Sequence, residues 1–349
     1  MTCVSFKSVL LASAFSICLL AASSAAHAAD EKTLYVYTWD TYADKDLFKQ
    51  FETETGIKVV TDIYSSNDEL LAKLKSGAAY DIVVPSGNYV PRLVSEKLLQ
   101  PLPADTRKFG DSMVKPMQHP AYDPDVTYVL PLFYGTTGLA VNTKLTKDKF
   151  DSWKDFFDRP AGAAKNLGVL DDVGTLLDVA SLKVDKPYCD ATPATLKAIQ
   201  AMLLAQKPFV KVYGSTGYTE RMAANEVAVQ MAWSGDAFKA REQNPAIQYV
   251  YPSEGVELWA DNLAIPVSAG NVDAAKKFIA FVLRSDVQVV YSDYTGMPPT
   301  QQGAADQLPE KLKNAPEYNI PASAKGIVSM ACPPAVNKSY QKIWESVQK

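Results

Sequence analysis

Three tryptophans in this chain stand within three residues of an aspartate, each at the end of a run rich in strand-forming residues. These neighbours are Trp39 and Asp40, Trp233 and Asp236, and Trp259 and Asp261. An indole face attracts an ammonium group by roughly 0.5–2 kcal/mol, and a carboxylate adds charge-assisted hydrogen bonds. Because open α/β sheets place their ligands at strand ends, the pattern indicates a pocket for an organic cation.

Two other tryptophans have acidic neighbours but lie in charge-rich, helix-like stretches. Trp153 is two residues before Asp155, and Trp344 is followed by Glu345. We predict that both indoles anchor the apolar face of a helix. Position at a strand end is therefore what distinguishes the first three tryptophans.

The first third of the chain alternates strand and helix patterns. Strands are predicted at residues 33–38, 57–64 and 80–84, and helices at 44–55 and 67–75. Gly56 and Gly77 follow the last periodic residue of each helix, as C-terminal glycines do, and Asn67 is the predicted N-cap of the second helix. This alternation predicts a parallel sheet with helices on both faces.

The rest of the chain repeats the pattern with more breaks. Strands are predicted at 139–141, 167–170, 209–213, 227–233, 247–251 and 257–266, and helices at 194–206, 216–225, 272–283, 286–294 and 337–347. Pro298 and Pro299 interrupt the pattern sharply. The last fifty residues of the chain are predicted to be irregular up to the final helix.

The N-terminus has the composition of a cleavable secretory signal. Lys7 precedes an apolar run at residues 9–22, and Ala26 and Ala28 frame a small-residue cleavage site. Ile17 precedes Cys18 where a lipoprotein signal requires a small residue. We therefore expect residues 1–28 to be removed and the protein to be exported without a lipid anchor.

Length, charge and cysteine content bound the class of protein. A mature chain of roughly 320 residues predicts two lobes rather than one core, and a net charge of −4 argues against nucleic-acid binding. Cys189 and Cys332 could form one disulfide in an oxidising compartment, but spacing alone does not decide this. They lack the spacing and histidine neighbours of a metal site, so no metal is expected.

Catalytic motifs are scarce. Beyond the signal the sequence has one histidine, His119, and it lacks a G-x-S-x-G elbow, a phosphate-binding loop and a G-x-G-x-x-G fingerprint. We therefore expect no cofactor and no enzymatic activity. One enzymatic alternative stays open, because paired acids could serve a secreted glycosidase; the acids concerned are Asp171, Asp172, Asp236 and Asp261.

Five segments, in this order, carry a family resemblance: residues 35–42, 51–59, 80–86, 232–238 and 259–266. They resemble the periplasmic polyamine-binding proteins of ABC importers, the spermidine/putrescine-binding family. The resemblance implies an α/β, two-lobed periplasmic binding protein of type II that closes over its ligand. It also implies a periplasmic location, an inner-membrane ABC permease as partner, a monomer and no nucleic acid.

The resemblance also implies where the lobes divide. It gives one lobe as residues 29–136 with about 262–300, and the other as 137–261 with about 301–349. The chain is expected to cross between them near residues 135–139 and 261–265.

Carried over by position, the resemblance assigns a binding site. Trp39, Trp259 and Trp233 are implied as aromatic walls. Asp261 is implied as the acid for an amino group, Asp236 as the acid of putrescine-preferring members and Asp172 as that of spermidine-preferring members. The remaining polar cleft positions are Asp40, Tyr42, Ser86, Asn88 and Tyr89.

Two departures from the family pattern leave the ligand open. Thr175 stands where the family usually has a glutamate that grips a terminal amine, and Met297 where members often present a tyrosine. The site residues therefore do not show whether a diamine or a longer polyamine is the preferred ligand. A γ-amino acid is the alternative in the same fold; its carboxylate would require an arginine, and the candidate is Arg221, which we predict on a polar helix face.

Overall fold

The computed structural model describes residues 32–159 and 164–349. The predicted signal peptide and its cleavage site thus lie outside the described residues. Across the described ranges, no helix has the length and apolar character needed to cross a membrane.

The predicted alternation of the N-terminal third is confirmed in order. It comprises β1 (Thr33–Trp39), α1 (Lys45–Thr55), β2 (Lys58–Tyr64), α2 (Asn67–Lys75) and β3 (Ile82–Val83). Gly56 ends α1 with a left-handed φ of 73°, as expected. The predicted N-cap of α2 was wrong, because Ser66 caps this helix by accepting from the Glu69 amide and the Asn67 side chain bonds Ser86 instead.

Further strands complete one mixed sheet with the order β2-β1-β3-β9-β4-β7-β5-β6. These strands are β4 (Val129–Asn142), β5 (Leu167–Val169), β6 (Val210–Tyr213), β7 (Val229–Trp233), β8 (Ile247–Val250), β9 (Val256–Ala264) and β10 (Gly326–Val328). β1 is parallel to β2 and β3, whereas β9 is antiparallel to β3 and β4. The parallel sheet predicted from residues 33–84 is therefore confirmed for β1 to β3, and β9 adds antiparallel pairing to it.

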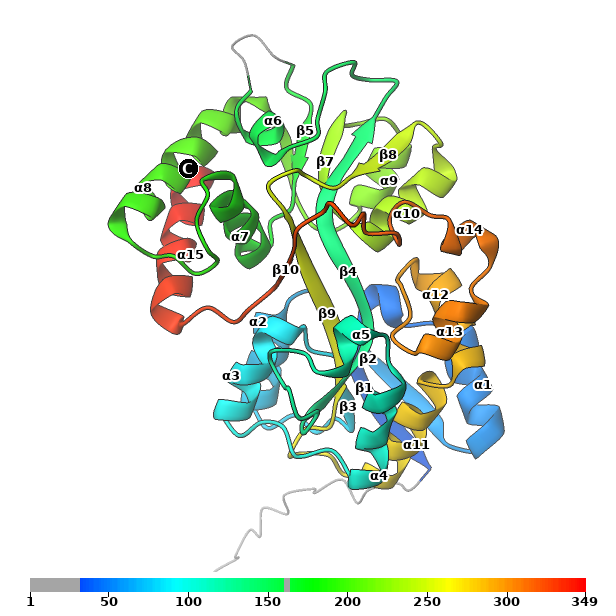
Figure 1. Cartoon of the computed structure of the whole chain (residues 1–349). Coiled ribbons are helices and arrows are strands. Elements are labelled where there is room, and N and C mark those ends of the chain that lie inside the picture. The colour runs from blue at the N-terminus through cyan, green and yellow to red at the C-terminus, as the bar shows by residue number, and fades with distance from the viewer. Residues whose placement is uncertain (1–31, 160–163) are drawn as a thin grey trace, which may run out of the picture.

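Two long strands, β4 and β9, run side by side through both halves of the molecule (Figure 1). At one end Ala264 pairs with Val83. At the other, Thr137 pairs with both Glu257 and Trp233. We call residues 133–137 of β4 and 257–261 of β9 the hinge ribbon.

Helices cover the two halves of the sheet. They are α3 (Val90–Ser95), α4 (Ala104–Arg107), α5 (Lys115–Gln118), α6 (Trp153–Phe157), α7 (Val173–Lys183), α8 (Pro193–Gln206), α9 (Tyr218–Ala223), α10 (Ser234–Gln243), α11 (Val272–Val282) and α12 (Ser285–Thr295), with short 3-10 turns η1 (Asp40–Tyr42), η2 (Gly87–Tyr89), η3 (Lys108–Ser112) and η4 (Lys207–Phe209). The C-terminal region is less irregular than predicted, since it forms α13 (Gln302–Gln307), α14 (Glu310–Lys313), β10 and α15 (Pro334–Gln348).

The buried apolar residues gather into separate cores. One joins residues from 139–249 with α15, and others join residues from 34–133 with parts of β9, α11 and α12. Trp153 is fully buried in the first core, and Trp344 meets the Tyr213 ring edge-on at 5.4 Å. Both indoles anchor helices, as predicted, while the lobe boundaries themselves stay a prediction.

Cys189 and Cys332 form a disulfide, with their Cα atoms 5.2 Å apart. This resolves the question that the sequence left open. The bridge joins the loop between α7 and α8 to the segment between β10 and α15, across 143 residues of chain.

Replacing both cysteines by serine should destabilise the protein by about 2–5 kcal/mol, because the bridge restricts a long loop in the unfolded chain. Urea unfolding of the mature protein measures this, with the reduced wild type as the control for the lost side chains. An unchanged unfolding midpoint in both samples would show that the bridge does not form.

Candidate functional site

The Asp261 carboxylate is the centre of the candidate site. One oxygen accepts a hydrogen bond from the Tyr42 hydroxyl at 2.6 Å and the other accepts from the Ser86 hydroxyl at 2.6 Å. The residue is 8 % exposed. Burial raises the pKa of Asp261 to about 6, and the two hydroxyl groups oppose that shift only in part.

Neutral groups, rather than cations, hold this carboxylate in place. The Asn67 amide donates to the Ser86 hydroxyl at 3.0 Å and accepts from the Ser86 backbone N–H at 3.0 Å. Among the described residues, no lysine or arginine forms an ion pair with Asp261 or Asp236. A positive charge to balance Asp261 would thus have to come from a bound group rather than from a described side chain.

The Trp259 indole lies flat across the hinge ribbon. Gly135 is its partner on β4, and a Cβ atom at Gly135 would stand only 2.4 Å from the indole ring. Alternate residues of a strand point to the same face, so Trp259 shares its face with Asp261 and Glu257. Aromatic and acidic side chains therefore alternate along one side of β9.

Trp39 and Asp40 take different positions. The Trp39 indole N–H donates to the Val84 carbonyl at 3.0 Å, and its ring lies 4.5 Å from that of Tyr64. Trp39 is half-buried, whereas Asp40 is exposed at the start of η1. Trp39 is thus fixed by packing and a backbone hydrogen bond beside the site, whereas Asp40 lies at the solvent-exposed edge.

Asp236 approaches from the other half of the molecule. It lies in the first turn of α10, three residues after Trp233, and accepts from the Thr219 hydroxyl at 3.2 Å. Burial raises the pKa of Asp236, against hydrogen bonds from Tyr218 and Thr219. Burial, the charge of Asp261 and, more weakly, the charge of Asp236 raise the pKa of Tyr42. Asp236 and Asp261 therefore both lie near enough to Tyr42 to influence it.

Asp172 and Tyr89 mark a second end of the site. Asp172 is the exposed N-cap of α7 and accepts from the Thr175 backbone N–H at 2.8 Å. Its charge, after burial and Asp68, contributes to the raised pKa of Tyr89. Beside Tyr89, the Asn88 side-chain oxygen is buried without a hydrogen-bond partner among the described residues. All three positions assigned from sequence thus fall at this end.

The two positions that depart from the family pattern are both covered. Met297 is 4 % exposed, and its sulfur would stand 2.4 Å from a Cβ atom at Gly235. It therefore packs closely against the start of α10. Thr175 is likewise buried, under the Asp172 cap.

Arg221 forms no ion pair among the described residues, and its Nε is buried without a hydrogen-bond partner there. Its guanidinium donates to the Gly214 carbonyl at 3.2 Å. The charged residue that acts on the pKa of Asp236 is Glu220, which raises it.

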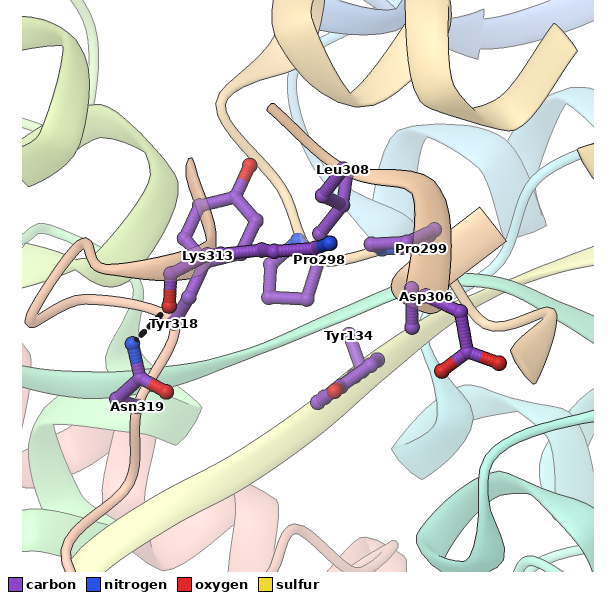
Figure 2. A pocket seen from close by; sticks show the side chains of 9 residues that line it. Tyr134, Pro298, Pro299, Asp306, Leu308, Lys313, Tyr318 and Asn319 are labelled. Carbon is purple, nitrogen blue, oxygen red and sulfur yellow. Dashed lines mark hydrogen bonds between the residues drawn. The ribbon is translucent and has the colours of Figure 1, made fainter. Parts of the chain in front are cut away.

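A surface pocket of about 370 Å³ lies on the opposite face of the hinge ribbon. Figure 2 shows Tyr134 of β4 facing Pro298 and Pro299 there. Tyr134 pairs with Ala260 and so alternates with the Gly135 and Trp259 pair. This pocket is therefore separate from the acids.

Several residues of the site were not predicted from sequence: Asn67, Tyr218, Thr219 and Glu257 support or border the acids. The period of two on the predicted strand 257–266 was a usable signal for Glu257. The hydroxyl groups of Tyr218 and Thr219 and the amide of Asn67 contact residues that are distant in sequence, and no local pattern predicts such contacts.

Asp261 should make the ligand-free protein less stable as the pH rises. Its folded pKa of about 6 exceeds its ordinary value of 3.8, so the folded state binds the proton more tightly. The resulting stability is fully present below about pH 4 and is lost as the pH passes 6, by about 3 kcal/mol in total. Urea unfolding across this range should show the loss.

Asp261→Asn should remove that part of the pH dependence, while the exposed control Asp125→Asn should keep it. Parallel stability curves for the two variants would contradict the assignment.

Comparison with known proteins places this geometry in a family. The sequence model of the family of bacterial extracellular solute-binding proteins matches residues 46–320. The spermidine/putrescine-binding periplasmic protein of Salmonella typhimurium is 33 % identical over 83 % of this chain and 84 % of its own length. The putrescine-binding periplasmic protein PotF of Escherichia coli is 28 % identical over 95 % of each chain.

A solved structure gives the same result. The spermidine/putrescine ABC transporter substrate-binding protein PotD from Streptococcus pneumoniae superposes with a TM-score of 0.79 at 25 % identity, covering 91 % of this chain and 98 % of its own. The predicted two-lobed α/β fold is confirmed. These relatives are binding proteins, and the glycosidase alternative is set aside. The chain belongs to the bacterial extracellular solute-binding protein family.

Proposed function

We propose that this protein is an exported, periplasmic receptor that binds a polyamine and delivers it to an inner-membrane ABC permease. The observation that carries the proposal is the buried Asp261 carboxylate, held by the Tyr42 and Ser86 hydroxyls with no cationic partner in the part of the chain that the structure describes. The names of the relatives, which bind spermidine and putrescine, support the same ligand class.

The electrostatics favour an amine over an amino acid. Asp261 and Asp236 supply negative charge, and Trp259 supplies an aromatic face that attracts ammonium groups. A γ-amino acid would also need a cation for its carboxylate. The candidate, Arg221, donates to the Gly214 carbonyl and keeps its Nε without a hydrogen-bond partner among the described residues, so the amino-acid alternative depends on this one side chain. The acids therefore select a ligand that is positive at more than one point.

The same charges explain why such a ligand would hold the lobes together. Asp261 lies on the hinge ribbon and accepts from Ser86, whereas Asp236 lies on α10. Asp261 is buried and Asp236 half-buried, and neither has a counter-ion among the described residues, so closure that desolvates them further is disfavoured by several kcal/mol. A cation between them removes that cost, so binding and closure are coupled.

Calorimetric titration with putrescine, spermidine, cadaverine and γ-aminobutyrate tests the proposal. We expect heat and a raised unfolding temperature with at least one of the three amines and none with γ-aminobutyrate. Asp261→Ala should weaken amine binding by about 2–5 kcal/mol, roughly thirtyfold or more, because a buried cation loses its partner.

Asp125→Ala, which removes an exposed acid, is the matched control and should bind like the wild type. If none of the amines releases heat or stabilises the wild-type protein, the polyamine proposal fails.

The indole platform has its own prediction. Gly135→Ala should weaken amine binding at least about tenfold, because the added methyl group would stand 2.4 Å from the indole of Trp259 and displace it. Gly326→Ala is the control, since a Cβ atom there has no neighbour within 4 Å. Unchanged affinity in a folded Gly135→Ala variant would remove Trp259 from the binding surface.

A further inference from the structure

Two further acids are buried next to the site. Glu257 of β9 is 2 % exposed and Asp178 of α7 is 3 % exposed. Neither takes part in an ion pair within the described ranges. Burial raises the pKa of Glu257 to about 7, and burial together with the charge of Glu257 raises that of Asp178 well above its ordinary value.

The backbone places Glu257 in line with the cation site. Glu257, Trp259 and Asp261 are alternate residues of β9 and share one face of the strand. The Glu257 carboxylate accepts from the Thr137 hydroxyl at 2.7 Å. An acid thus stands on either side of the indole, along one edge of the hinge ribbon.

Helix α7 brings its polar residues to the same end. Asp172, Thr175 and Asp178 follow one another at intervals of three and so lie along one side of the helix. After burial, the hydroxyl groups of Thr137 and Ser329, then the charge of Asp172 and the Thr175 hydroxyl, act on the pKa of Glu257. The Glu257 carboxylate therefore lies beside the position where the family usually has its own glutamate.

One oxygen of this cluster lacks any partner. Oδ1 of Asp178 is buried without a hydrogen bond among the described residues. A buried polar atom in this condition requires a specific explanation, and a carboxylate oxygen can only accept. A donor that carries positive charge satisfies it best.

We propose that Glu257, with Asp178 behind it, binds the far ammonium group of the ligand and replaces the acid that is missing at Thr175. This inference rests on the proposed polyamine function and names the ligand class within it. The two ends of the ligand are then held by Asp261 and Glu257, with Trp259 between them.

The spacing selects a long ligand. Four residues of β9 place Glu257 and Asp261 about 13 Å apart at their Cα atoms. An extended chain advances about 1.2 Å per bond because of its bond angles, so the five bonds of a four-carbon diamine span at most about 6 Å and the nine bonds of a triamine such as spermidine about 11 Å. A triamine reaches both acids, whereas a diamine engages only one end.

The test compares spermidine and putrescine by calorimetry in Glu257→Gln. We expect spermidine affinity to fall at least about thirtyfold and putrescine affinity to change less than about threefold. The matched control is Glu226→Gln, which removes an exposed glutamate of the same half and should change neither. Asp178→Asn, which leaves β9 intact, should also weaken spermidine more than putrescine.

A second variant separates binding from folding. Thr175→Glu in the Glu257→Gln background returns an acid to the same end and should restore spermidine affinity at least about tenfold. Unchanged spermidine affinity in Glu257→Gln, or an equal loss of both amines without rescue, overturns the inference while the polyamine function stands. Failure of the wild type to bind any amine overturns both.

Discussion

Carboxylates that are buried without a cationic partner in residues 32–159 and 164–349 are the constraint on which the rest of this structure depends. Taking an ionised carboxylate out of water costs several kcal/mol. The Tyr42 and Ser86 hydroxyl groups that donate to Asp261 offset this cost only in part, since the pKa of Asp261 stays raised at about 6. The neighbouring acids Asp236 and Glu257 share the condition. A ligand that brings positive charge therefore stabilises the protein at the very positions where the ligand-free fold is least favourable.

The fold keeps these acids buried and in order. Within the hinge ribbon, the pairing of β9 with β4 fixes the spacing of Asp261, Trp259 and Glu257. Asp236 lies in the first turn of α10, and Asp172 caps α7. The partial positive charge of a helix N-terminus favours a nearby carboxylate, and Asp172 is exposed and Asp236 half-buried, so these two acids bear less desolvation than the buried acids of β9. The strand acids depend more on the ligand.

Local patterns were enough to predict much of this. Alternation of strand and helix predicted β1 to β3 in order, and the tryptophan and aspartate neighbours pointed to Asp261 and Asp236. Most of β4 was missed, because Pro131, Gly135 and Gly138 interrupt its apolar run and such residues usually end strands. Contacts such as that of Tyr42 with Asp261, 219 residues apart, leave no trace in local spacing. Glu257 was missed for another reason, since its period of two was present and only its burial gave it meaning.

Proton release on ligand binding tests the central claim most directly. Ammonium groups resemble lysine, with an ordinary pKa near 10.4, so protons released between pH 6 and 7 must come from the protein. Calorimetry of spermidine binding in buffers of different ionisation enthalpy counts them. The account predicts release of a substantial fraction of one proton or more between pH 6 and 7, falling towards zero by about pH 9. Tight binding with no proton release at any pH between 5 and 8 would show that the buried acids are not neutralised by the ligand.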